Sequence, residues 1–194
     1  MEYKEKHSSQ NDDEAYLFEM DKKMAVKVLM KEYGEEIKRL IYTYTKSWSS
    51  ADDLSQEVFV SVYLHLDKFE RKSYIRSWIY SIAINRCKDY LKSWHYRNMQ
   101  LLEKLPLGKA ASATEIPEHH LLMEDASREM MQRIFSLPIK YRELIILYYY
   151  KELSVKEISE LLQLSESVIK TRLHRGREKL RLTFTEREGS EFHV

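Results

Sequence analysis

The chain has 194 residues, of which 32% are charged and 43% apolar, and its formal net charge is +1; this composition excludes low-complexity and collagen-like chains. Its 4 glycines and 3 prolines disfavour a turn-rich β-sandwich, and its single cysteine, Cys87, excludes an internal disulfide framework and a cysteine-based zinc finger. No apolar run approaches the roughly 18 residues of a membrane span, and the first residues lack the apolar core of a secretory signal, so we expect a cytoplasmic protein without a membrane-inserted segment.

The small net charge conceals strong local imbalances. Residues 1–21 carry a net charge of −5 and residues 98–129 carry −3, whereas residues 71–97 carry +6 and residues 169–181 carry +5. Two basic segments separated by an acidic one indicate two surfaces that face a polyanion such as a nucleic acid. The alternative is that both segments are solvated faces of ordinary helices.

The first predicted helix follows an acidic tail. Residues 1–23 are polar and lack a sustained period, so we expect no stable core element there. From Met24 to Tyr44 apolar residues recur at helical spacing, which predicts a helix that Gly34 kinks or breaks. Residues 47–50 then form a short predicted loop.

A second helix is predicted from Ser50 to about Phe69. Ser50 and Asp53 are three residues apart and resemble a capping box that opens the helix. Carboxylates cluster near its start, where they suit the positive end of the helix dipole. They are either plain capping charges or part of a contact surface.

A third helix is predicted to reach Ser93 after a short polar connection at residues 70–73. One of its faces is apolar, and the other carries much of the first basic segment. Trp78 suits either core packing or stacking on an unpaired base, and Asn85 suits either an adenine contact or solvent. We expect Cys87 to be a small core residue and not a redox group.

The second half of the chain begins with a predicted flexible linker. Residues 94–124 contain two prolines, a glycine and only a weak period. A second helical domain is predicted over residues 125–184, before a tail at residues 185–194. Pro138 suits the first turn of a helix in this domain. The three tyrosines 148–150 lie inside the helical pattern and are expected to pack in the domain core.

Two short helices end the second domain. Ser154 and Glu157 fit a capping box for the first, and Ser165 caps the second, which is predicted to run to about Phe184. The three-residue turn between them indicates a helix-turn-helix, with an ordinary amphipathic hairpin as the alternative. Lysine, arginine and threonine alternate with the apolar anchors of the second helix, and these side chains contact phosphates and base edges. The expected buried anchors are Val168, Ile169, Leu173, Leu180 and Leu182.

Three segments in this order resemble the extracytoplasmic-function sigma factors of the sigma-70 family. Residues 50–60 (SADDLSQEVFV) are similar to a helix of conserved region 2, and residues 76–92 (RSWIYSIAINRCKDYLK) to the family's promoter-melting and −10-reading helix. Segments between residues 137 and 180 resemble region 4. The resemblance covers roughly residues 24–184 and implies an all-α protein of two small helical domains joined by a flexible linker.

The resemblance assigns region 2 to residues 24–93 and region 4 to residues 125–184. Region 2 would bind the clamp of core RNA polymerase and open the −10 element, and region 4 would read the −35 element and touch the polymerase flap. The acidic linker would pass through the polymerase cleft in place of a third domain. The loop before Trp78, which would hold an extruded −10 base, lacks the glycine of many relatives, so the identity of that base stays open.

The resemblance also implies three sets of contact residues. The polymerase-binding residues are Asp52, Asp53, Gln56 and Glu57. The residues that contact the −10 DNA are Tyr74, Arg76, Trp78, Asn85, Arg86, Lys88 and Lys92. The residues that contact the −35 DNA are Ser165, Lys170, Thr171, Arg172, His174, Arg175 and Arg177.

Together these features predict an RNA polymerase sigma factor that directs promoter-specific transcription initiation, in a stress or envelope response. Its partners would be core RNA polymerase, promoter DNA and the membrane-bound anti-sigma factor that the family commonly has. The sequence shows no Gly-rich phosphate loop, paired histidine ligands or nucleophile elbow, so we expect no enzyme activity, cofactor or metal. Two alternatives remain open: a stand-alone helix-turn-helix regulator that binds DNA without polymerase, and a helical adaptor that binds no DNA.

Overall fold

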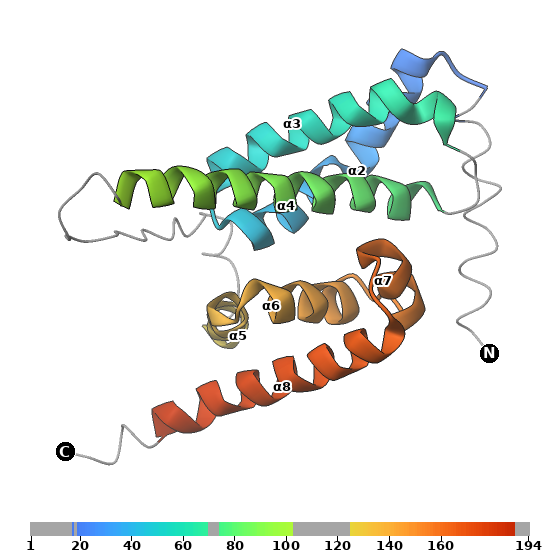
Figure 1. The fold of residues 1–194 in the computed structure, drawn as a ribbon. Coiled ribbons are helices and arrows are strands. Elements are labelled where there is room, and N and C mark those ends of the chain that lie inside the picture. Colours follow the sequence, from blue (N-terminus) through green and yellow to red (C-terminus); the bar gives the residue numbers. More distant parts are fainter. Residues whose placement is uncertain (1–16, 18, 70–73, 103–124, 189–194) are drawn as a thin grey trace, which may run out of the picture. The chain divides into compact units, whose positions relative to one another are not determined.

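The computed structural model describes residues 17, 19–69, 74–102 and 125–188 (Figure 1). In these ranges the chain is helical apart from turns and contains no strand, which confirms the all-α class. None of the described helices is long and apolar enough to span a membrane. The chain forms two compact units, residues 1–113 and residues 114–194, and each is described by itself.

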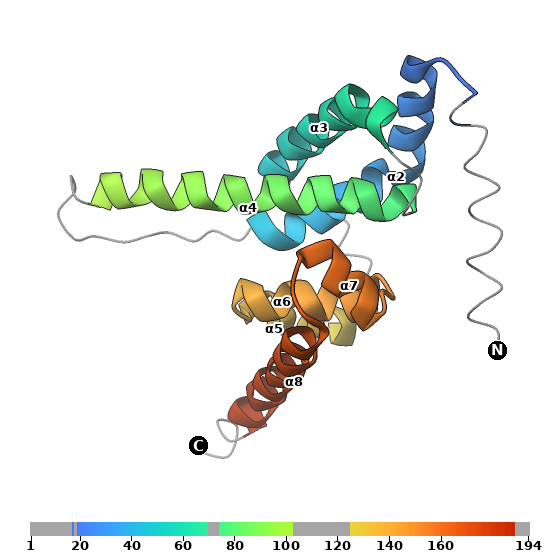
Figure 2. The same cartoon turned by 45° about the vertical axis from the view of Figure 1, so that its right-hand side comes forward.

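In the described residues of the first unit, three long helices pack together, and a short 3₁₀ turn follows the second of them. The elements are α2 (Lys22–Thr45), α3 (Trp48–His65), η2 (Leu66–Lys68) and α4 (Ile75–Leu102). Each of α2, α3 and α4 contacts the other two (Figure 2). Ile37 of α2, Val58 of α3 and Ile79 of α4 are completely buried between them. Removal of this apolar surface from water is the main favourable term in the stability of the unit.

Two details at the α2–α3 connection differ from the sequence predictions. Helix α2 continues through Gly34 without a break. The predicted loop at residues 47–50 and the capping box at Ser50 are wrong, because α3 already begins at Trp48 and Ser47 is its N-cap. The Ser47 side chain accepts a hydrogen bond from the Ser50 backbone N–H at 3.3 Å, and the Trp48 ring stacks on Tyr42 with the centroids 4.4 Å apart. This aromatic contact between α2 and α3 holds Trp48 in the first helical turn.

Helix α4 ends later than predicted. It reaches Leu102 instead of Ser93, because residues 94–102 contain neither proline nor glycine to stop a helix. The predicted connection at residues 70–73, most of the predicted linker and most of both predicted tails lie outside the described residues.

Over residues 125–188, the second unit forms four α-helices and one π-helical turn. They are α5 (Asp125–Ser136), α6 (Ile139–Ile145), η4 (Ile146–Tyr150), α7 (Val155–Leu162) and α8 (Glu166–Glu188). Helix α8 packs against α5, α6 and α7. Gly176 lies where α8 contacts α6, and a Cβ there would be in ordinary van der Waals contact, 3.5 Å from Ile145 and Tyr141, so a larger side chain would not fit without a shift. At the far end of α8, Arg133 of α5 binds the Thr183 carbonyl and lies over the Phe184 ring.

The prediction that the three tyrosines 148–150 pack in the core is wrong. Their exposed fractions are 39%, 49% and 49%, whereas Ile146 and Leu147 directly before them are buried. The π-helical turn at Ile146–Tyr150 explains the difference, because a π turn changes the angular register of a helix and so rotates the tyrosines outward. The expected burial of Val168 and Leu182 in α8 is likewise wrong, because both are exposed.

Substitution of Gly34 by alanine tests the uninterrupted α2. No atom lies within 4 Å of the position that a Cβ would occupy at Gly34. Gly34→Ala is therefore expected to raise the free energy of unfolding by about 0.5–1 kcal/mol through helix propensity alone. Thermal unfolding followed by circular dichroism measures the change. Gly176→Leu should instead destabilise the protein, and a loss of stability in Gly34→Ala would show that α2 needs glycine at this position.

Candidate nucleic-acid interfaces

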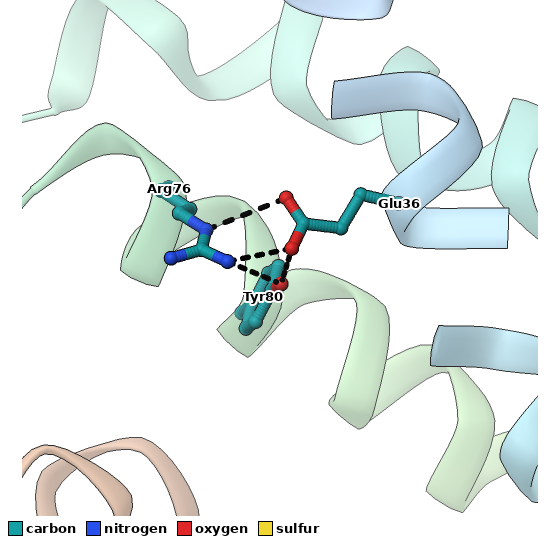
Figure 3. A network of polar contacts seen from close by, with 3 residues as sticks. All are labelled: Glu36, Arg76 and Tyr80. Carbon is teal, nitrogen blue, oxygen red and sulfur yellow. Dashed lines mark hydrogen bonds and ion pairs between the residues drawn. The ribbon is translucent and has the colours of Figure 1, made fainter. Parts of the chain in front are cut away.

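A polar network joins α2 to the first turns of α4 (Figure 3). The Glu36 carboxylate accepts hydrogen bonds from the Arg76 guanidinium, with Nη2–Oε1 at 2.6 Å and Nε–Oε2 at 3.4 Å. The Tyr80 hydroxyl donates to the same Glu36 Oε1 at 2.5 Å, and Arg76 Nη2 also donates to the Tyr80 oxygen at 3.3 Å. One carboxylate therefore satisfies two donors that are one helical turn apart on α4.

The network settles the protonation of its members. Burial raises the pKa of the Tyr80 hydroxyl, and the hydrogen bond to Glu36 raises it further, so Tyr80 stays neutral and donates. Burial lowers the pKa of Arg76, but the hydrogen bonds and the electrostatic attraction of Glu36 and Tyr80 together outweigh this effect, so the net pKa is raised and Arg76 stays charged. Tyr80 has no exposed surface and cannot stack on a base. The predicted DNA contact of Arg76 is not tested. The guanidinium already donates hydrogen bonds to Glu36 and Tyr80.

A cavity of about 410 Å³ lies between the end of α3 and the first half of α4. Trp78 and Ile82 give it an apolar part, and the ring of Trp78 lies 5.1 Å from the ring of Phe69, centroid to centroid. Its remaining lining is polar: Ser61, His65, Lys68, Asn85, Arg86 and Asp89. The cavity thus combines an aromatic face with hydrogen-bonding groups and cations, as a site for a nucleotide requires.

Ser61 organises the polar side of the cavity from a buried position on α3. Its hydroxyl donates to the Glu57 carbonyl at 3.0 Å and accepts from Arg86 Nη2 at 2.9 Å, so Arg86 of α4 is fixed against α3. The Ser61 backbone carbonyl accepts from His65 Nδ1 at 2.8 Å. His65, Lys68 and Ser61 were not among the predicted contact residues, because no local pattern shows that the end of α3 faces α4.

The other predicted −10 contacts lie on or near the same part of α4. Asn85 and Lys92 are exposed, and Lys92 forms an ion pair with Asp89 at 3.5 Å. Tyr74 and Lys88 are half-buried. Trp78, Asn85 and Arg86 are the three predicted residues that the structure brings together around the cavity.

The outer face of α3 carries the predicted polymerase contacts. All four are exposed, and Asp52 forms an ion pair at 2.6 Å with Lys38 of α2, which also lies over the Trp48 ring. Val60, Tyr63 and Leu64 follow on the same face with exposed fractions of 59%, 44% and 60%. Spacings of three and four residues place them in line with Gln56 and Glu57. They were missed, although their position outside the buried stripe of Leu54, Val58 and Val62 was a usable signal.

The helix-turn-helix is built as predicted. Ser154 and Glu157 form a reciprocal capping box at the start of α7, and the Ser165 hydroxyl accepts from the Val168 backbone N–H at 3.4 Å at the start of α8. Gln163, between the two helices, adopts a left-handed backbone conformation with φ of 56°. Ile169 and Leu173 anchor α8 in the unit, as expected.

The basic residues of α8 face solvent. Exposed side chains alternate with the buried anchors, and Arg172 is half-buried; the exposed predicted contacts are Lys170, Thr171, His174, Arg175 and Arg177. Lys170 forms an ion pair with Glu166 at 3.4 Å, one turn earlier on the helix. In contrast to Lys170, Arg172 and Arg175 form no ion pair with the described acidic side chains of α8.

Cys87 lies in the core of the first unit and has no exposed surface. Burial raises the pKa of its thiol to about 12, so the reactive thiolate does not form near neutral pH. Cys87 therefore acts as a small apolar residue of α4, as the sequence predicted.

Comparison with known proteins adds three kinds of similarity. Residues 29–95 match the family described as sigma-70 region 2, and residues 127–180 match sigma-70 region 4. The chain is 34% identical over 155 residues to the ECF RNA polymerase sigma factor SigW of Bacillus subtilis, which covers 77% of this chain and 83% of SigW. It is 29% identical over 161 residues to SigM of the same organism, covering 83% of this chain and 96% of SigM.

A solved structure has the same fold. The sigma factor RpoE of Bartonella quintana, solved in complex with the anti-sigma factor NepR, superposes with a TM-score of 0.66 at 19% identity. The match covers 82% of this chain and 96% of that protein.

Removal of the Glu36 carboxylate tests the network. Glu36→Ala leaves the Arg76 guanidinium and the buried Tyr80 hydroxyl without their common acceptor, which should lower the free energy of unfolding by about 1–3 kcal/mol. Glu35→Ala, at an exposed neighbour on α2, should change it by no more than about 0.5 kcal/mol. Urea unfolding measures both values. Equal values for the two variants would mean that the network does not stabilise the protein.

Proposed function

This chain belongs to the extracytoplasmic-function sigma factors of the sigma-70 family, and from that premise we propose how its two units divide promoter recognition. It is an RNA polymerase sigma factor that directs promoter-specific transcription initiation, and it binds RNA polymerase and promoter DNA. A role in a stress or envelope response fits this family. Membership of the family also argues against the two alternatives, a stand-alone helix-turn-helix regulator and a helical adaptor that binds no DNA.

The cavity between α3 and α4 is the observation that carries the assignment of the −10 contacts. We assign it to one unpaired base of the −10 element. An unstacked base needs an aromatic or apolar surface and hydrogen-bonding groups at its edge, and Trp78 and Asn85 supply one of each. Lys68 and Arg86 offer positive charge to the adjacent phosphates.

The outer face of α3 is the proposed polymerase surface. Its first part is acidic, with Asp53 and Glu57 exposed, and its last part is apolar, with Val60 and Leu64 exposed. Carboxylates steer association with a basic partner, and apolar side chains contribute to affinity once water is excluded. The two parts together suit a partner helix or hairpin that is basic at one end and apolar at the other.

Region 4 carries two proposed surfaces. Arg172, Arg175 and Thr171 of α8 enter the major groove of the −35 element, while Arg177 and Arg181 follow its phosphates. The exposed tyrosines 148–150 form the proposed contact with the polymerase flap, because exposed aromatic side chains are frequent anchors of protein interfaces.

Regulation and location follow from the same assignment. RpoE of Bartonella quintana was solved in complex with an anti-sigma factor, and we propose that this chain also has an anti-sigma factor as a partner. Because it acts on polymerase and chromosomal DNA, we propose a cytoplasmic location. It recruits and positions polymerase and itself catalyses no reaction.

Run-off transcription tests the proposed function as a whole. Purified protein and core polymerase are combined with fragments of the genome that encodes the chain, and a specific transcript is expected only when both proteins are present. A gel shift with and without core polymerase accompanies it. Specific duplex binding without polymerase, and no specific transcript with it, would contradict the assignment.

Charge reversal on α3 tests the polymerase surface. Asp53→Lys combined with Glu57→Lys should lower the affinity for core polymerase by roughly tenfold at low salt, with a smaller effect at high salt because exposed charges are screened. Glu32→Lys, at an exposed position of α2, is the matched control and should leave the affinity unchanged. Binding titrations measure the affinities. An unchanged affinity in the double variant would contradict the polymerase contact and would mean that these carboxylates act only as capping charges at the helix N-terminus.

Single alanine substitutions on α8 separate base contacts from phosphate contacts. Arg172→Ala or Arg175→Ala should cost about 1–3 kcal/mol and relax the preference at one −35 base pair. Arg177→Ala should weaken all sequences alike and lower the slope of log affinity against log salt by about one. A panel of −35 mutants at several salt concentrations measures both effects. If neither Arg172→Ala nor Arg175→Ala altered any preference, α8 would not read the −35 element.

A further inference from the structure

His65 lines the proposed base cavity but has no role in the assignment above. We propose that His65 is a specificity-determining residue for the unpaired −10 base, and that it favours the amino bases adenine and cytosine over the oxo bases guanine and thymine. This inference rests on the proposed function of the cavity. It assigns to this chain a base preference that the sequence left open.

The hydrogen bond to Ser61 fixes the tautomer of His65. Its Nδ1 lies 2.8 Å from the backbone carbonyl oxygen of Ser61, one helical turn earlier on α3. A carbonyl oxygen only accepts hydrogen bonds, so Nδ1 must carry the proton. In the uncharged ring the other nitrogen, Nε2, is then an acceptor. Among the described residues no side chain donates to it, and the ring forms part of the cavity lining.

An acceptor at the edge of a base distinguishes two chemical classes. Adenine and cytosine present an exocyclic amino group at C6 or C4, which donates to a nitrogen acceptor. Guanine and thymine present a carbonyl oxygen at the same positions, which places two acceptors against each other. The His65 ring is exposed in the free protein, so the mismatch costs the hydrogen bond to water that Nε2 loses when a bound base covers it.

The other polar groups of the cavity do not favour one class of base in common. Arg86 is engaged by the Ser61 hydroxyl, and the Asp89 carboxylate forms an ion pair with Lys92 at 3.5 Å. The Asn85 amide both donates and accepts, so it fits either class of base. Lys68 only donates, and it therefore opposes His65 by favouring the oxo bases.

The experiment uses the full chain with core polymerase. The first step finds which −10 base occupies the cavity. An abasic nucleotide is placed at each −10 position in turn, and the position sought is the one at which it lowers run-off transcription by the wild type but not by Trp78→Ala. All four bases are then compared at that position of the non-template strand. His65→Ala should lower the transcription ratio of amino to oxo bases by about 3- to 10-fold, the range for one neutral hydrogen bond. His65→Lys, which only donates, should shift the ratio further toward the oxo bases.

Ser61→Ala is the matched control inside the same cavity. It removes the hydroxyl that holds Arg86 but keeps the backbone carbonyl that holds His65, so the ratio of amino to oxo bases should be preserved even if total transcription falls. Thermal unfolding checks that each variant is folded. A purely structural role of His65 would change stability or total transcription without changing the ratio.

The outcomes separate the two claims. An unchanged ratio in His65→Ala and His65→Lys, with the abasic effect still dependent on Trp78, overturns the role of His65 and leaves the cavity assignment intact. If no −10 position shows a Trp78-dependent abasic effect, the cavity assignment fails and the inference fails with it.

Discussion

The carboxylate of Glu36 holds the beginning of α4 against α2, and the proposed −10 surface depends on this contact. A single oxygen of Glu36 accepts from both Arg76 and Tyr80, which are one turn apart on α4. Two donors on successive turns fix both the rotation of α4 about its axis and its position along it. Trp78 lies between them on the same turns, so its ring is held at the wall of the cavity without a polar contact of its own.

Ser61 of α3 fixes two further side chains of the cavity through hydrogen bonds. Its hydroxyl holds Arg86 of α4 and its carbonyl orients His65, so one buried residue places two side chains of opposite hydrogen-bonding character at the same cavity. The outer face of α3 points away from this packing and stays open, with carboxylates at its start and apolar side chains at its end. One helix thus carries residues of both the proposed DNA surface and the proposed polymerase surface, because the period of 3.6 residues per turn separates the two faces.

In the second unit, the close approach of α6 and α8 decides which side of α8 stays exposed. Gly176 lies at this contact, where a Cβ would touch Ile145 and Tyr141, and Ile169 and Leu173 are buried on the same helix. Arg133 fixes the far end of α8 through the Thr183 carbonyl and the Phe184 ring. Both ends of α8 are therefore fixed by packing, and the basic side chains between them keep a constant orientation. This suits the proposed entry of α8 into the major groove of the −35 DNA.

The sequence by itself determined the helical class, the helix-turn-helix and the burial of Cys87, Ile169 and Leu173, because these follow from local period and capping chemistry. It also placed Trp78, Asn85 and Arg86 on one helix. Only the tertiary structure decided that Arg76 pairs with Glu36, about forty residues earlier, that His65 joins the cavity, and that the tyrosines 148–150 face solvent. The first two depend on which helix faces pack together, and the third on a change of helical register at Ile146–Tyr150. Local spacing specifies a helix and its faces, but the contacts between residues far apart in the chain arise only when those faces are packed.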